Sequence, residues 1–123
     1  FVKNYFGSPV ANTFRRSALE EVGGFDTWYT YILDYDFWVE LACRGNVYII
    51  HEPLNCFRVR NDSNTGEVMV GDKSDAYVKE HIHLLNKFKD ELNLSDADIK
   101  RSVAIRKFRN FAAGVYLKVF VRK

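Results

Sequence analysis

The chain contains 123 residues, of which 47% are hydrophobic and 15% aromatic, and its formal net charge is +2. This length and composition fit one compact folded domain and exclude an intrinsically disordered chain. Because no apolar run approaches the roughly 18–20 residues of a membrane-spanning helix, the sequence predicts a soluble segment. It begins at Phe1 rather than at an initiator Met, so we expect a segment of a longer protein.

The first predicted helix begins at Ser17, because Ser17 and Glu20 have the spacing of a capping box. Gly23 is expected to end this helix in a left-handed conformation. An aromatic-rich loop then leads to a second helix over residues 34–44, which Gly45 ends. The helical spacing of apolar residues predicts that its buried face consists of Phe37, Trp38, Leu41 and Ala42.

Short apolar runs predict two strands, over residues 47–50 and 54–59, with a turn between them. Residues 60–75 are polar and glycine-containing, which is typical of a loop. A helix is predicted over residues 74–92, and Ser95 is expected to cap a last helix that reaches the C-terminal end. The apolar stripe expected along this last helix comprises Ile99, Val103, Phe108, Phe111, Ala112, Val115 and Val119.

The cysteines and histidines show no metal-ligand spacing. Cys43 and Cys56 are therefore predicted to be free thiols at buried positions, in a reducing compartment. His51, His81 and His83 are predicted to lie on the surface or on helix faces.

Charge is distributed unevenly along the chain. Residues 1–98 carry 10 basic and 16 acidic side chains, so their net charge is 10 − 16 = −6, whereas residues 99–123 carry 8 basic side chains and no acidic one, or +8. A basic C-terminal end of this kind suits an anionic membrane surface, a nucleic acid or an acidic partner. No known nucleic-acid-binding motif accompanies the charge, so nucleic acid is not the expected partner.

Two carboxylates, Asp34 and Asp36, stand at the beginning of the second predicted helix. From local pattern alone, Asp34 is a helix cap and Asp36 a solvated acid of the first turn. A second interpretation makes the two residues a DxD motif that shares a divalent cation with diphosphate oxygens. A third makes one of them a general base beside the aromatic loop, where Trp28 and Tyr29 stack on a sugar or simply pack in the core.

A wider pattern surrounds these acids. The segments VANTFRRSAL (residues 10–19), VGGFD (22–26) and DYDFWVELA (34–42) are followed in order by Gly45, EPL (52–54) and FR (57–58). This order and spacing resemble the C-terminal half of family-2 glycosyltransferases, over about residues 1–65. The resemblance implies an α/β fold, namely a partial GT-A (Rossmann-like nucleotide-diphospho-sugar transferase) fold that lacks most of its donor-binding half. Residues 1–65 would be the acceptor-side part, and residues 66–123 a helical C-terminal extension.

The same resemblance implies roles for individual residues. Asp34 matches the general base of inverting members, with Asp36 as the alternative base. Leu33 stands where the family has a glutamate, and Arg60 where it has a histidine near the donor diphosphate. Arg58 and Arg60 are accordingly the candidate phosphate-binding residues.

The implied function is transfer of a sugar, with inversion, from a nucleotide-sugar to a glycan or lipid-linked acceptor, as in polysaccharide biosynthesis for the cell envelope. The parent enzyme would be cytoplasmic or peripheral at the inner face of the plasma membrane, and this fragment alone would be inactive. Its divalent cation, Mn or Mg, would be bound mainly outside these residues. The alternative is a non-catalytic module that binds a partner or an anionic membrane through the basic C-terminal helix. A homo-oligomer is compatible with either reading.

Overall fold

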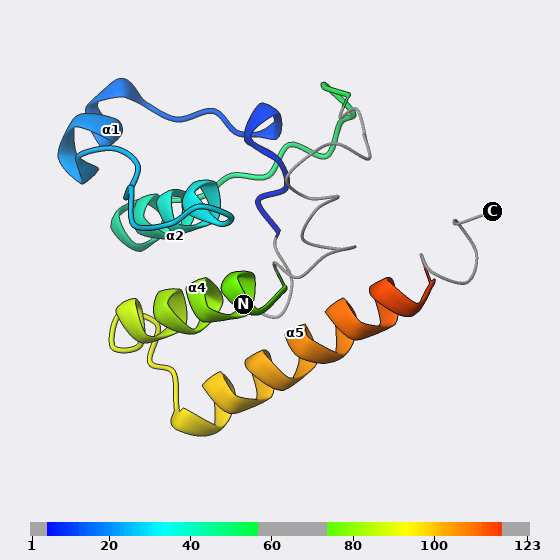
Figure 1. Cartoon of the computed structure of the whole chain (residues 1–123). Coiled ribbons are helices and arrows are strands. Elements are labelled where there is room, and N and C mark those ends of the chain that lie inside the picture. The colour runs from blue at the N-terminus through cyan, green and yellow to red at the C-terminus, as the bar shows by residue number, and fades with distance from the viewer. Residues whose placement is uncertain (1–4, 57–73, 117–123) are drawn as a thin grey trace. The chain divides into compact units, whose positions relative to one another are not determined.

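The computed structural model describes residues 5–56 and 74–116, and every regular element in these two stretches is a helix (Figure 1). The elements, in chain order, are the 3-10 helix η1 (Pro9–Ala11) and the α-helices α1 (Arg16–Val22), α2 (Leu33–Arg44), α4 (Ser74–Lys87) and α5 (Asp96–Tyr116). The chain forms two compact units, one of residues 3–58 and one of residues 1–2 and 59–123.

The predicted α/β fold, a partial GT-A fold, is wrong for the described residues, because they contain no strand. Residues 47–50, predicted as a strand, have no regular secondary structure and are between 56% and 89% exposed. A strand is defined by hydrogen bonds to a neighbouring strand, and an apolar run alone does not supply that neighbour. Of the second predicted strand, residues 54–56 also form no ladder, and residues 57–59 lie outside the described part.

Helix α1 differs from the prediction at its beginning and matches it at its end. Its N-cap is Arg15, which makes no side-chain capping bond, so the predicted capping box of Ser17 and Glu20 is wrong. Glu20 instead accepts from Arg16 Nε at 2.9 Å, one turn away on the exposed surface. The helix does end as predicted at Gly23, whose φ of 87° is left-handed and whose amide donates to the Leu19 carbonyl at 2.9 Å.

Helix α2 is anchored by an aromatic cluster. The Phe37 ring lies 4.5 Å from the Phe25 ring and 5.2 Å from the Phe14 ring, centroid to centroid, and Trp38 lies 5.4 Å from Phe14. The predicted burial of Phe37 and Trp38 is therefore confirmed. The rest of the predicted face is only partly right. Leu41 and Ala42 are half-buried, whereas Tyr35, Asp36 and Val39 are buried.

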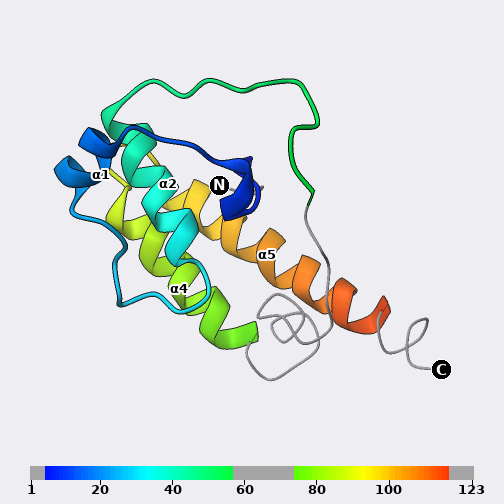
Figure 2. The ribbon, with the colours of Figure 1, turned by 90° about the horizontal axis from the view of Figure 1, so that it is seen from above.

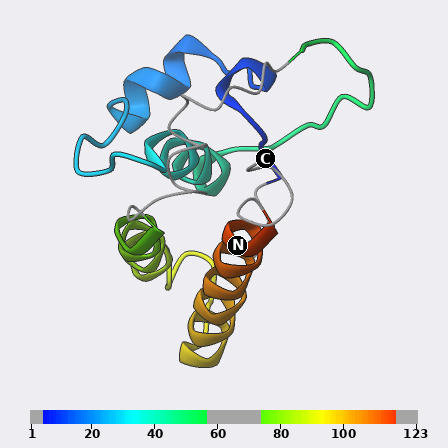
Figure 3. The ribbon, with the colours of Figure 1, turned by 45° about the vertical axis from the view of Figure 1, so that its right-hand side comes forward.

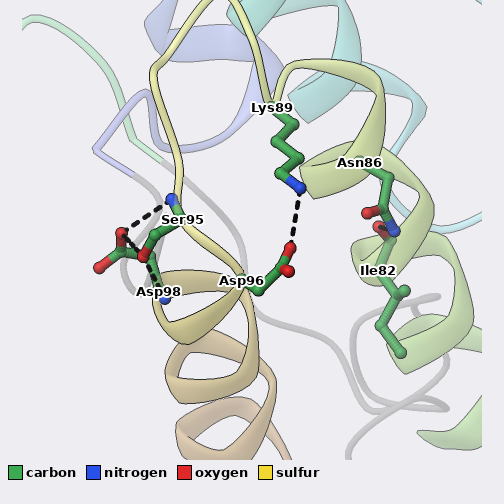
Figure 4. A network of polar contacts seen from close by, with 6 residues as sticks. All are labelled: Ile82, Asn86, Lys89, Ser95, Asp96 and Asp98. Atoms are coloured by element: carbon green, nitrogen blue, oxygen red, sulfur yellow. Dashed lines mark hydrogen bonds and ion pairs between the residues drawn. The ribbon is translucent and has the colours of Figure 1, made fainter.

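Helices α4 and α5 form an antiparallel hairpin (Figure 1), and Figure 3 shows the pair with α4 seen nearly end-on. Ser74, the first residue of α4, accepts at Oγ from Nδ2 of Asn110 on α5 at 3.1 Å. At the other end of the pair, Lys89 Nζ donates to Asp96 Oδ1 at 2.7 Å (Figure 4). The apolar side chains buried in this unit are Val78, Leu84, Leu85, Phe88 and Ile99.

The start of α5 is capped as the sequence predicts (Figure 4). Ser95 Oγ accepts from the Asp98 amide at 3.2 Å, while Asp98 Oδ2 accepts from the Ser95 amide at 3.0 Å. These are the two reciprocal bonds of a capping box, with Asp in place of the usual Glu. The preceding helix is shorter than predicted, since α4 ends at Lys87 rather than at Leu92, and turns follow it.

Candidate functional site

The candidate site is the beginning of α2, where Leu33 is the first helical residue and Ile32 the N-cap. Asp34 is therefore the second residue of the helix, and its predicted role as the N-cap is wrong. Its carboxylate still serves the helix end, because Oδ1 accepts from the backbone amide of Tyr35 at 2.8 Å. That amide belongs to the first turn, which has no intrahelical acceptor for it. A negative side chain is also favourable there, at the positive end of the helix dipole.

Asp34 is half-buried, and this burial sets its acidity. Removal of the carboxylate from water raises the pKa of Asp34 above its ordinary value of 3.8, although hydrogen bonds from the Tyr35 and Asp34 amides act in the opposite direction. A raised pKa makes the ionised carboxylate a stronger base. The side chain thus combines partial access to solvent with more basicity than an exposed aspartate has.

Asp36 is in a different environment, with only 2% of its surface exposed. The prediction of a solvated first-turn acid is therefore wrong. Its amide makes the first regular helical bond of α2, to the Ile32 carbonyl at 2.9 Å. Position i+2 lies about 200° around the helix from position i, so Asp34 and Asp36 point to different sides of α2.

This geometry does not fit a DxD metal site, since two carboxylates on opposite sides of a helix cannot hold one cation. Among residues 5–56 and 74–116, no group of three or more His, Cys, Asp or Glu side chains could hold a metal ion. The cation predicted for a parent enzyme, to be bound mainly elsewhere, is not tested by these residues.

The loop before α2 presents one aromatic side chain and buries the next. Trp28 is 54% exposed, whereas Tyr29 is 4% exposed. Asp26 holds the turn, because its Oδ1 accepts from the Trp28 amide at 2.9 Å and its carbonyl accepts from the Tyr29 amide at 3.3 Å. The Trp28 and Tyr29 rings make an edge-on contact at 5.0 Å between centroids. Trp28 thus presents an exposed aromatic ring on this loop, and the buried Tyr29 ring packs against it.

Of the residues to which the family resemblance draws attention, Leu33 lies in the described part of the chain, and Arg58 and Arg60 do not. Leu33, where the family has a glutamate, is 37% exposed at the first position of α2. The predicted phosphate-binding residues Arg58 and Arg60 lie outside the described part of the chain.

A buried polar pair between α4 and α5 was not predicted from the sequence. His81 and Ser102 are both buried, and His81 Nε2 lies 3.1 Å from Ser102 Oγ. Burial, together with the positive charge of Arg106, lowers the pKa of His81 from 6.5 to about 4. His81 was predicted to lie on the surface or on a helix face; it lies on a face of α4, and that face is buried. A signal was present, because Val78, His81 and Leu85 recur at the i, i+3, i+7 spacing of a buried helix face.

The cysteines also differ from expectation. Neither Cys43 nor Cys56 forms a disulfide, as predicted, but both side chains are exposed rather than buried. Neither therefore contributes to the core. Among the described helices, none combines the length and the apolar character needed to cross a membrane.

Part of the chain is similar to a known protein. The chain is 34% identical over 67 residues to the uncharacterized protein MT1568 of Mycobacterium tuberculosis (strain CDC 1551 / Oshkosh). The matched stretch covers 54% of this chain and 21% of that protein, so the chain spans about a fifth of its relative's length. No protein-family model matches the chain, and no solved structure matches it.

Proposed function

We propose that this chain carries the acceptor-side catalytic segment of an inverting glycosyltransferase, with Asp34 as the general base. The observation that supports this most directly is the half-buried Asp34 carboxylate, whose pKa burial raises, at the first turn of α2. It occurs within the run of motifs that resembles family-2 glycosyltransferases. The proposal concerns this chemistry and does not require the segment itself to form a sheet.

In the proposed reaction, the Asp34 carboxylate accepts the proton of an acceptor hydroxyl. As this proton is transferred, the hydroxyl oxygen forms a bond to the anomeric carbon of a nucleotide-sugar, and the bond from that carbon to the diphosphate breaks. The nucleotide diphosphate leaves with the bonding electrons. One displacement from the opposite face inverts the anomeric centre, whereas retention would need a second carboxylate as a nucleophile.

Burial supports Asp34 rather than Asp36 as the base. A general base must come within about 3 Å of the proton that it removes, or act through one water molecule. The Asp36 side chain, at 2% exposure, is closed to an acceptor in this conformation, whereas Asp34 is half-exposed. Trp28 supplies an exposed aromatic face in the loop that leads to the same helix, and aromatic faces bind the apolar faces of pyranose rings.

The proposal also includes a donor site, which the described residues do not support. Arg58 and Arg60 would contact the donor diphosphate, and the cation and nucleotide would be bound by other parts of a longer protein. The acceptor would be a glycan or a lipid-linked sugar. The enzyme would work in the cytoplasm or at the inner face of the plasma membrane.

The test is sugar transfer by the full-length protein that contains this segment, after the substitution Asp34→Asn. Asn keeps the shape of the side chain and can still accept from the Tyr35 amide, but it cannot take a proton. Loss of a general base costs roughly 10²–10⁴-fold in rate. The matched control is Asp75→Asn, which alters an exposed acid in the first turn of α4.

Transfer that Asp34→Asn leaves at the level of the control would refute the assignment. Loss of transfer in Asp36→Asn alone would move the role to that residue, provided that the variant folds as judged by circular dichroism. For the unsubstituted protein, the rate should fall on acidification as Asp34 becomes protonated, with a midpoint above pH 3.8 because its pKa is raised.

A further inference from the structure

Helix α5 has two faces with side chains that a protein usually buries, and α4 covers only one of them. On the covered side, Ile99 and Ser102 are buried, and Asn110 bonds to the first residue of α4. On the other side, Phe108 is 69% exposed and Phe111 70% exposed. Nine residues separate Ile99 from Phe108, which at about 100° per residue places them on opposite sides of the helix.

The exposed side chains form a continuous apolar stripe. Its members lie at spacings of three and four residues, and they are Ala104, Phe108, Phe111, Ala112 and Val115, all exposed. Because Asn110 pairs with the first residue of α4, the end of α5 continues beyond that helix, as Figure 2 shows. Phe111, Ala112 and Val115 are thus remote from the α4 contact along the helix as well as around it, whereas Ala104 and Phe108 are separated from that contact only around the helix.

Basic side chains border this stripe. Lys100 and Lys107 lie along one edge, Arg109 lies along the other, and Arg101 lies at its N-terminal end, all of them exposed. The acids of α5, Asp96 and Asp98, are confined to its first turn, and residues 99–123 contain no acidic side chain. The face that is apolar along its middle is therefore cationic along its margins.

We propose that this face of α5 docks on the surface of an anionic lipid bilayer, with the helix axis in the plane of the membrane. Large apolar side chains in the middle of a helix face and Lys or Arg at its margins are the features with which a helix lies at a bilayer interface. Phe108 and Phe111 would enter the boundary between headgroups and acyl chains, and the basic margins would contact anionic headgroups.

Charge complementarity favours this occupant over a second copy of the chain. Two copies that met through the same face would bring their Lys and Arg margins together, and neither contributes an acid from residues 99–123. A bilayer is flat and anionic, so both margins can be neutralised while the stripe is buried. This inference does not rest on the proposed sugar transfer, because no residue of the α2 site takes part in it.

The test is flotation of the full chain with vesicles of phosphatidylcholine alone and of phosphatidylcholine with about a quarter phosphatidylglycerol. We expect binding to the anionic vesicles and a marked loss of it when NaCl is raised from about 0.1 M to about 0.5 M. The double variant Phe108→Ser/Phe111→Ser should weaken binding at least about tenfold, since it removes two large apolar side chains from the interface. Both side chains are exposed, so the fold should tolerate their loss.

Matched controls test whether binding depends on this face of α5 rather than on any exposed aromatic side chain or any positive charge. Tyr48→Ser removes an 89% exposed aromatic side chain outside α5 and should leave binding unchanged. Lys107→Gln should weaken binding, whereas Lys79→Gln removes the same charge from an exposed position on α4 and should not. In a Phe111→Trp variant, brominated lipids should quench the new fluorescence more than that of Trp28 and Trp38.

Three results would overturn the inference. The first is absence of binding to the anionic vesicles at low salt. The second is binding that the double phenylalanine variant leaves intact. The third is that the unsubstituted chain binds no vesicles and is a dimer in sedimentation equilibrium, while the double variant is a monomer. That result would assign the face to a second copy.

Discussion

Acidification should loosen the packing of α4 against α5 through one residue, His81. Its ring is buried beside Ser102 Oγ, and the positive charge of Arg106 lies near enough to disfavour a second cation. Its pKa is lowered to about 4, mainly by burial, against 6.5 for an unburied histidine. Between these pH values the unfolded chain binds a proton that the folded unit does not. The free energy of unfolding must therefore decrease as the pH falls from 6.5 towards 4.

The size of the effect follows from the two pKa values. The difference between 6.5 and about 4 corresponds to roughly 3 kcal/mol, all of it lost once the pH is below about 4. The acids at the start of α5 act in a lower range. The pKa values of Asp96 and Asp98 are lowered, by Lys89 and Ser95 respectively, so the stability that they contribute is lost only below pH 3.8. The window above pH 4 therefore reports on His81 within this unit.

The assay must follow α4 and α5 specifically, because Trp28 and Trp38 both lie in the unit of residues 3–58 and report on that unit. We would measure urea unfolding from the NMR signals of α4 and α5 amides, at pH 7 and at pH 4.5. The substitution His81→Gln removes the titrating group and should abolish most of the loss. His83→Gln changes an exposed histidine of the same helix and should behave like the unsubstituted chain.

Two results would refute the reasoning. One is an NMR titration in which the His81 ring protonates near pH 6.5 in the folded state. The other is a loss of stability between pH 7 and pH 4.5 that is equal in the unsubstituted chain and in His81→Gln. Either would mean that the imidazolium is accommodated in the fold without cost.

Three further substitutions test the fold. Ser95→Ala should destabilise α5 by about 1 kcal/mol, because it leaves a first-turn amide without its side-chain acceptor; amide hydrogen exchange in the first turn of α5 would measure this, and unchanged exchange would contradict the cap. Gly23→Ala should lower the free energy of unfolding in urea by about 1 kcal/mol, because Gly23 has a φ of 87°, although the site has room for a methyl group. Gly23→Asn should lower it less. Phe37→Ala should lower the free energy of unfolding by roughly 3–5 kcal/mol, because it removes the ring that contacts both Phe14 and Phe25. Tyr48→Ala, at an exposed position, should leave the free energy of unfolding almost unchanged. Similar unfolding midpoints for the two variants would contradict the packing.

Several features that depend on a few neighbouring residues could be predicted from the sequence, although the caps expected at Ser17 and Asp34 are not found. The left-handed cap at Gly23, the cap at Ser95 and the end of α2 at Gly45 are all found where they were predicted. The cap at Gly23 follows from the backbone freedom of glycine, and the cap at Ser95 from a short side chain that reaches the next turn. Gly45 instead ends α2 in an extended conformation, at a φ of −153°. The burial of Phe37 and Trp38 was equally accessible, because it follows from helical periodicity.

Features that depend on distant residues could not be predicted in this way. A strand needs a partner, and residues 47–50 have none among the described residues. The burial of Asp36 likewise depends on what packs over α2, which composition does not reveal. For His81, the helical spacing with Val78 and Leu85 indicated a buried face, but not the contact with Ser102 on α5. The apolar residues of α5 were predicted as one stripe, although Ile99 and Phe108 belong to opposite faces. For the candidate site, the sequence located Asp34 and Trp28, but only the structure shows that Asp34 is half-buried and Trp28 exposed.

The exposed run at residues 47–50 has a consequence for the behaviour of the isolated chain in solution. Val47, Tyr48, Ile49 and Ile50 are uncharged, favour extended backbone and have 56% to 89% of their surface exposed. Such a segment is a template for intermolecular cross-β pairing, and natural proteins usually interrupt it with a charge. Light scattering should therefore rise with protein concentration, and Ile49→Lys should suppress the rise without altering the helical circular dichroism. If scattering is the same in both proteins, another surface controls the solubility of the chain.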